Sequence, residues 1–306
     1  MSKKMKDNFE KLKERVLDSL NNTDESIYES LASIKGNTIV TGVCGSSVTA
    51  TFAAKVLEAK NNVDTTKVVE PNDLAYTKID AYKNVLSCSY SGNNFGVYLA
   101  FKNKLNHYLI SSKANPGKGI ANLTYSSNNP ENSFISLAGT LIPCSILLNY
   151  YLDGKKEKVA SIIQSYKYNF DAQCDTFEIF TSEETSTACK FLETTFVESG
   201  IGIPLVHRKY DYCHGRSTIS NNYKTIAIFI STNSDIDRFL LEKIPKYYKE
   251  VIVINTTKGI IGDYTALIKC MYLAKYIAET KKIDLSDVNH SPLVYSLYHY
   301  GSSHMV

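Results

Sequence analysis

Short apolar runs rich in β-branched residues alternate along this chain with longer segments whose apolar residues recur every three or four positions. Such runs occupy residues 38–43 and 84–88, and the same rhythm restarts after residue 176. The runs are typical of strands buried on both faces, and the spaced segments are typical of amphipathic helices. Strands alternating with helices predict parallel βαβ units, which bind ligands at the carboxyl ends of their strands.

The pattern predicts strands and helices along almost the whole chain. The expected strands are 38–43, 67–69, 84–88, 107–110, 120–124, 177–181, 203–207, 225–230 and 251–255. Two helices are expected before the first strand, and a long apolar helix is expected from about Ser133 to Leu152. A shorter helix is predicted from about Asn94 to Lys104, and a final long one from Tyr264 to Thr280.

A charged segment at 153–158 contains the only nearby glycine and marks a linker between two similar halves. We therefore predict an α/β fold of two doubly wound parallel-sheet halves with flanking helices. The predicted parts are N-terminal helices over 1–35, a first domain over 36–153, a second over 154–285 and a tail over 286–306.

Composition removes several classes of protein from consideration. The 306 residues carry a net charge of only +3 and no long basic run, so a nucleic-acid partner is not expected. No apolar run is long enough to cross a bilayer, and the N-terminus is charged, so we expect a cytosolic protein without a membrane partner. The seven cysteines include no Cys-x-x-Cys pair and are expected to be buried, reduced thiols. The sequence shows no cluster of metal-ligating residues, so neither a metal nor a redox cofactor is expected.

Two strand-to-helix turns of the first half, at 41–49 and 87–94, combine glycine with small hydroxyl residues. At such turns the free N–H groups and the positive end of the helix favour an anion. Helix capping is the alternative for either turn alone, but two such turns on neighbouring strands favour a phosphate site. A nucleotide P-loop would need a Gly-Lys-Ser/Thr ending, which neither turn has. Glu70 lies where the ribose-binding acid of a dinucleotide site would lie. The first turn, however, has only Gly42 and Gly45 and not the three glycines of the G-x-G-x-x-G motif.

The spacing of these turns resembles that of the SIS (sugar isomerase) domain family. Gly42-x-x-Gly45-x-Ser47 precedes Ser89-Tyr90-Ser91-Gly92-Asn93-Asn94 by about forty residues, and the second motif looks like that of phosphoglucose/phosphomannose isomerases. The resemblance implies two flavodoxin-like SIS domains and a phosphorylated sugar as ligand. It makes Ser47, Ser89 and Ser91 phosphate ligands, with Asn94 where threonine is usual. It also suggests sugar contacts from Gly45, Ser46 and Tyr90.

The first turn of the second half, Thr181–Thr185, has no glycine and carries two acids that would repel a phosphate. We therefore expect one ligand site per chain.

Two residues of the second half suit proton-transfer chemistry. Glu198 ends a predicted helix. His214 lies sixteen positions after Glu198 and directly precedes Gly215. A partly desolvated glutamate suits a base that moves a proton between neighbouring carbons, and histidine suits acid–base opening of a sugar ring. A solvated helix-end carboxylate and a loop histidine are the alternatives. The spacing resembles that of SIS isomerases, which makes Glu198 the base and His214 the ring-opening group. Arg216 is expected either to contact the substrate or to form a surface ion pair.

No paired acid is expected for the remaining histidines, His207 among them. The family resemblance further implies a homodimer with a shared active site, which the C-terminal tail covers. The leading prediction is an aldose–ketose isomerase of a phosphorylated sugar. A deglycase or deaminase of a sugar-phosphate amine and a non-catalytic sugar-phosphate sensor remain as alternatives.

Overall fold

The computed structural model describes residues 2–21, 25–61, 65–127, 129–131, 133–154, 166–220, 225–286 and 292–293. They form two compact units, each built around one parallel sheet. The five-stranded unit comprises the described residues of Arg15–Pro130, Ala138–Lys156 and Val288–Val306. The four-stranded unit comprises those of Met1–Glu14, Glu131–Leu137 and Glu157–Asp287. The predicted linker lies mostly outside the described residues, and so does nearly all of the predicted tail.

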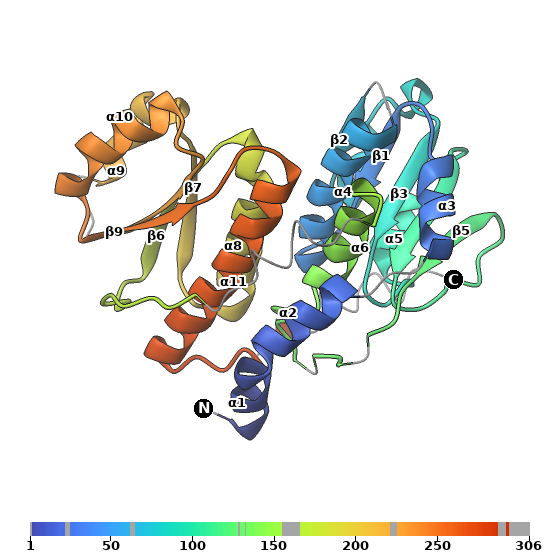
Figure 1. Ribbon diagram of the computed structural model, residues 1–306. Helices are drawn as coiled ribbons and strands as arrows, with labels where there is room; N and C mark the ends of the chain where they lie inside the picture. The colour runs from blue at the N-terminus through green and yellow to red at the C-terminus, as the bar shows by residue number, and fades with distance from the viewer. Residues whose placement is uncertain are drawn as a thin grey trace. The chain divides into compact units, whose positions relative to one another are not determined.

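The sheet of the five-stranded unit has the strand order β2-β1-β3-β4-β5, with every neighbouring pair parallel (Figure 1). Its strands are β1 (Thr38–Thr41), β2 (Thr66–Val68), β3 (Asn84–Cys88), β4 (Asn106–Ser111) and β5 (Ile120–Thr124). Helices α4 (Gly45–Asn61) and α6 (Leu141–Tyr151) pack side by side, and α4 contacts β1 and β3. Helix α5 (Phe95–Ala100) contributes Ala100 to a cluster with Ile39 and Val85, and it also contacts the 3-10 helix η1 (Pro71–Tyr76). Helix α3 (Glu25–Ser33) contacts β5.

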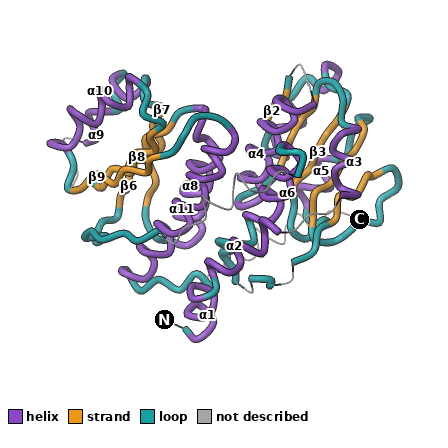
Figure 2. Tube along the Cα trace, in the orientation of Figure 1, coloured by secondary structure: helices purple, strands orange, loops and turns teal. Residues whose placement is uncertain are grey.

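The sheet of the four-stranded unit has the order β7-β6-β8-β9, again all parallel. Its strands are β6 (Thr176–Thr181), β7 (Ile203–Arg208), β8 (Ile226–Ser231) and β9 (Glu250–Asn255). Helices α8 (Ser186–Ser199) and α11 (Ile260–Lys281) pack together, and Phe196 of α8 stacks edge-on against Phe177. Because side chains alternate along a strand, Phe180 points to the opposite face. There it packs with residues of α10 (Asp235–Lys243) and of the 3-10 helices η4 (Asp211–Cys213) and η5 (Ile244–Tyr247). Figure 2 shows the strands of this sheet in orange, with helices α8 and α11 in purple beside them.

These two sheets confirm the predicted fold class, and each of the nine predicted strands is present within a few residues of its expected bounds. Both strand orders begin 2-1-3-4 when each unit is numbered by itself, which is the order of flavodoxin-like folds. No helix among the described residues combines the length and apolarity that crossing a bilayer would need.

Three helix predictions need correction. The segment expected to form the first helix forms two helices, α1 (Lys3–Glu10) and α2 (Leu12–Asn21), separated at Lys11. The helix expected from Ser133 begins only at Leu141. Pro143 explains this start, because proline lacks an N–H group and is tolerated in the first turn of a helix but not in its interior. The helix expected over 94–104 ends at Ala100.

Candidate functional site

The two glycine- and serine-containing turns lie next to each other in the five-stranded unit. They follow β1 and β3, which pair directly from Thr38↔Asn84 to Thr41↔Ser87. The chain continues from β1 to β2 on one side of this pair and from β3 to β4 on the other. Such a reversal point is where open α/β sheets bind ligands. The turns are in close proximity, because a Cβ placed on Gly96 would lie 3.0 Å from the Cγ2 atom of Val43.

The first turn is tightly closed by its own backbone. A Cβ at Gly42 would lie 2.5 Å from the carbonyl oxygen of Ser46, so only glycine fits there. The Ser47 hydroxyl donates to the carbonyl oxygen of Cys44 over 2.6 Å, and Ser47 is 1% exposed. Gly45 and Ser46 remain half-buried at the start of the 17-residue helix α4, where the positive end of the helix dipole lies.

Hydrogen bonds also organise the second turn, which we call the Ser89–Asn94 turn. Asn94 caps α5, its Oδ1 accepting from the Val97 N–H over 3.0 Å. The hydroxyl oxygen of Ser89 accepts from the Gly92 N–H at 3.1 Å and from the Asn94 amide at 3.2 Å. Ser89 therefore still has its own hydroxyl proton to donate, although its side chain is buried. Ser91 and Tyr90 are exposed.

Residues that the sequence analysis missed hold the Ser89–Asn94 turn from the β4–β5 loop. The Asn115 side chain donates to the carbonyl oxygen of Gly92 over 2.7 Å. The Ser112 N–H and hydroxyl both donate to the carbonyl oxygen of Tyr90, at 3.0 and 2.7 Å. Thr140, which precedes α6, lies against Gly45, 3.6 Å from where a Cβ would stand. The run of small polar residues directly after β4 was the available signal.

The chemistry of these two turns fits an anion. Neither segment, 41–49 or 87–94, contains an acidic residue. Burial raises the pKa of the thiol of Cys88, the last residue of β3, which keeps that thiol neutral. Burial also raises the pKa of Tyr125. Neutral donors and a helix N-terminus are thus available, and neither turn contributes a negative charge of its own.

Capping and turn closure account for part of the hydroxyl pattern. Ser47, Ser89 and Asn94 all make hydrogen bonds inside the turns, while Ser91 is exposed. The same side chains would have to serve both the turn and a ligand if all four contact a phosphate.

Glu198 and His214, the predicted catalytic pair, do not meet within one chain. Glu198 lies in the last turn of α8, before β7 begins, and one of its carboxylate oxygens is buried. His214 follows β7 and is exposed. A six-residue strand is roughly 17–20 Å long. The two residues also belong to opposite faces of the sheet, because Tyr212, two residues before His214, packs on Phe180 on the side of α10.

Three further predictions about side chains have definite outcomes. The exposed Arg216 donates to the carbonyl oxygen of Val206 over 2.9 Å. The expectation for His207 was wrong, because its Nε2 lies 2.9 Å from Oε2 of the fully buried Glu178. Glu178 also accepts from the Tyr248 hydroxyl at 2.7 Å and the Thr225 hydroxyl at 3.0 Å. The seven cysteines are free thiols, of which Cys44 and Cys213 are exposed rather than buried.

A pocket in the four-stranded unit lies where α8 leads into β7. Its lining includes Val197, residues 200–204 and Lys281. The Lys281 ammonium group already donates to the carbonyl oxygen of Ile201 over 2.6 Å. This pocket is made mainly of apolar side chains and backbone, and it is not where the predicted phosphate ligands lie.

Solved structures of similar fold are available for comparison, although no protein-family model and no curated protein matches the sequence. Tagatose-6-phosphate ketose/aldose isomerase from Escherichia coli superposes with a TM-score of 0.73 at 12% identity, covering 95% of this chain and 97% of that one. Glucosamine-6-phosphate deaminase from Thermotoga maritima gives 0.71 at 14% identity, covering 94% and 97%. The C-terminal domain of glucosamine-fructose-6-phosphate aminotransferase from Francisella tularensis gives 0.66 at 12% identity, covering 93% and 96%. At these identities the likeness establishes the fold.

Proposed function

We propose that this protein binds a phosphorylated sugar, with the phosphate held by the Gly42–Ser47 and Ser89–Asn94 turns. The observation that carries the proposal is the position of both acid-free turns at the β1/β3 reversal point of one sheet. The three solved structures named above support it, since the name of each includes a sugar phosphate. Ser91 and the Ser89 hydroxyl proton are among the donors that the turns leave available to a ligand.

The reaction that we propose is aldose–ketose isomerisation, with Glu198 moving a proton between C1 and C2 and His214 opening the sugar ring. The two residues lie at opposite ends of β7 in one chain, so we propose that each active site takes one of them from each chain of a homodimer. A glutamate supplied by one chain and a histidine supplied by the other give two identical sites per dimer.

Phosphate binding is tested first, without reference to catalysis. Inorganic phosphate and a panel of hexose and pentose phosphates are titrated by calorimetry into wild type, Ser91→Ala and Ser33→Ala. Losing a hydrogen bond to a charged group costs about 1.5–3 kcal/mol, so Ser91→Ala is expected to bind about tenfold or more weakly. Ser33 is the matched control, an exposed serine of the same unit whose hydroxyl donates to the carbonyl oxygen of Ser30. Equal affinities of the two variants would contradict the proposed phosphate site.

Catalysis is tested by exchange of the C2 proton in heavy water with each sugar phosphate that binds. Glu198→Gln is expected to retain binding and lose exchange, and His214→Ala is expected to lose turnover of the cyclic sugar. Co-expression of the two inactive chains should restore about a quarter of wild-type activity, because half of the dimers are mixed and each mixed dimer has one intact site. If wild type catalyses exchange but the co-expressed chains regain no activity, each active site takes both residues from one chain. Binding without exchange would instead indicate a sensor, and ammonia released from an amino-sugar phosphate would indicate a deaminase.

A further inference from the structure

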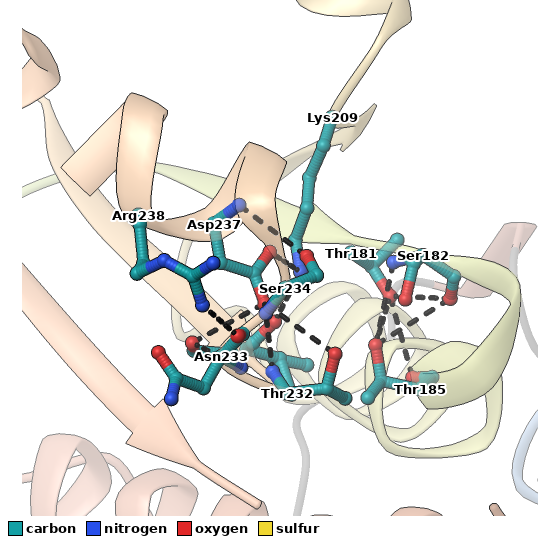
Figure 3. Close-up of polar contacts among 11 residues, drawn as sticks. Thr181, Ser182, Thr185, Lys209, Thr232, Asn233, Ser234, Asp237 and Arg238 are labelled. Carbon is teal, nitrogen blue, oxygen red and sulfur yellow. Dashed lines mark hydrogen bonds and ion pairs between the residues drawn. The ribbon is translucent and has the colours of Figure 1, made fainter. Parts of the chain in front are cut away.

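The four-stranded sheet has its own reversal point, between β6 and β8, equivalent in topology to the β1/β3 point. The chain passes from β6 to β7 on one side and from β8 to β9 on the other. The turn Ser182–Thr185 follows β6, and the turn Thr232–Ser234 follows β8. Figure 3 shows these two turns together with Lys209, Asp237 and Arg238. Topology alone would make this a second ligand site.

The turn after β8 is filled by a carboxylate of the chain itself. Oδ2 of Asp237, in the first turn of α10, accepts from the Thr232 N–H at 2.8 Å and the Ser234 N–H at 3.2 Å (Figure 3). The hydroxyls of Ser231 and Thr232 lie at 3.3 and 3.4 Å from the same oxygen. Asn233, between the two N–H donors, has a left-handed backbone with φ of 60°. Converging N–H groups around a left-handed residue form an anion-binding concavity.

A buried cation completes this arrangement. Lys209 directly follows β7, and its Nζ lies 2.5 Å from Oδ1 of Asp237. The same ammonium group donates to the carbonyl oxygen of Ile230 at 2.7 Å. Lys209 is 4% exposed and Asp237 is 0% exposed, so neither charge is solvated by bulk water. Each charge therefore depends on the other, because an unpaired buried charge is strongly destabilising.

The turn after β6 is partly closed by its own hydrogen bonds. The hydroxyl groups of Thr181 and Thr185 are hydrogen-bonded to each other at 2.9 Å, and the Ser182 N–H donates to the Thr185 hydroxyl at 3.3 Å. The Thr181 and Thr185 hydroxyls and the Ser182 N–H are thus engaged within the turn (Figure 3).

We infer that the Asp237 carboxylate is a built-in anion that occupies and closes the anion site at the second reversal point. Removing this carboxylate should therefore leave a buried site, bounded by the Lys209 ammonium group and the Thr232–Ser234 N–H groups, that accepts a small carboxylate from solution. The inference does not rest on the proposed function, because it concerns stability and a different turn.

The test is chemical rescue of Asp237→Ala by formate. Thermal unfolding is followed by circular dichroism with sodium formate or with sodium chloride at equal ionic strength. Asp237→Ala is expected to unfold at a much lower temperature than wild type. Formate at about ten times its dissociation constant should raise that temperature by a few degrees, because a ligand that binds only the folded state stabilises it. Wild type should respond equally to the two salts.

The matched control is the double variant Lys209→Met/Asp237→Ala, which has the same space but no cation. We expect it to unfold at a higher temperature than Asp237→Ala and to be insensitive to formate, because it leaves no uncompensated charge. Formate acting no better than chloride on Asp237→Ala, or equally well on the double variant, would overturn the inference.

A variant that keeps the packing decides the matter should Asp237→Ala fail to fold in either salt. Asp237→Asn removes the charge with almost no change in shape. Adding Lys209→Met to Asp237→Asn should raise the unfolding temperature if Lys209 is the counterion of the built-in carboxylate. A further fall in that temperature would refute the pairing on which the inference depends.

Discussion

Replacing Gly92 with alanine should disrupt the Ser89–Asn94 turn through backbone strain and a steric clash. Gly92 has φ of 74°, and a Cβ added there would lie 2.5 Å from the backbone carbonyl oxygen of Lys113. A left-handed L-residue costs roughly 1–2 kcal/mol, and the clash must be relieved by moving backbone. That movement also threatens the 2.7 Å hydrogen bond from Asn115 to the Gly92 carbonyl, worth about 1 kcal/mol. The free energy of unfolding should fall by about 2–3 kcal/mol.

Gly119→Ala separates strain from displacement of the turn. Gly119 lies in the β4–β5 loop, which also contains Lys113, and has φ of 77°, but no atom beyond its chain neighbours lies within 4 Å of its added Cβ. This variant should therefore show the left-handed strain alone, about 1–2 kcal/mol. Urea unfolding measures both variants, and calorimetric titration with inorganic phosphate measures binding. Gly92→Ala should lose more stability than Gly119→Ala and should bind phosphate at least tenfold more weakly. Equal stabilities, or phosphate affinity unchanged by Gly92→Ala, would refute the argument.

Two further predictions concern the four-stranded unit. Burial tends to raise the pKa of Asp284, but hydrogen bonds from two serines outweigh it and lower this pKa to about 2. A lowered carboxyl pKa contributes stability above its usual value near 3.8 that is lost as the pH falls toward 2. Asp284→Asn should therefore remove about 1 kcal/mol of the stability that wild type loses between pH 5 and 2.5, allowing for solvent screening. Urea unfolding of both proteins measures this, and the same stability difference between them at pH 5 and at pH 2.5 would contradict it. Tyr248→Phe takes one donor from the buried Glu178 and should cost about 1–3 kcal/mol in urea unfolding. Tyr247→Phe, at an exposed neighbouring residue, should be neutral, and equal losses would show that the hydrogen bond to Glu178 is not responsible.

The strands could be predicted from the sequence because burial on both faces leaves an unmistakable composition. Residues 84–88 and 226–231 are buried along their whole length, and apolar residues dominate both segments, with only Asn84, Ser87 and Ser231 polar. Helix ends were harder, because the apolar residues at 134, 135, 137 and 138 continue the apolar pattern of the helix that follows. The Phe134 and Ile135 N–H groups instead donate to the carbonyl oxygens of Ser286 and Leu285. Such long-range pairing leaves no local pattern.

The candidate site divides in the same way. Glycine and serine spacing identified both turns of the five-stranded unit, since the residues that shape each turn are adjacent in sequence. The supporting residues Ser112 and Asn115 come from the next strand-to-strand connection, and nothing in their spacing links them to Gly92. Glu178 interrupts an apolar strand, which was a visible signal of a buried polar contact, but its partner His207 is 29 residues away and needs the β6/β7 register to be found.

The two reversal points differ in where the negative charge comes from, and this difference sets how many phosphates one chain can bind. At the β1/β3 point, segments 41–49 and 87–94 contain no acid, so both turns offer an incoming phosphate neutral donors and a helix N-terminus. At the β6/β8 point a phosphate would have to displace Asp237 and leave that carboxylate buried without its cation. Uncompensated buried charges cost about 3–5 kcal/mol, which exceeds what a few neutral hydrogen bonds could return. One phosphate per chain is therefore expected whatever sugar carries it, and Asp237→Ala is the change that should allow a second anion to bind.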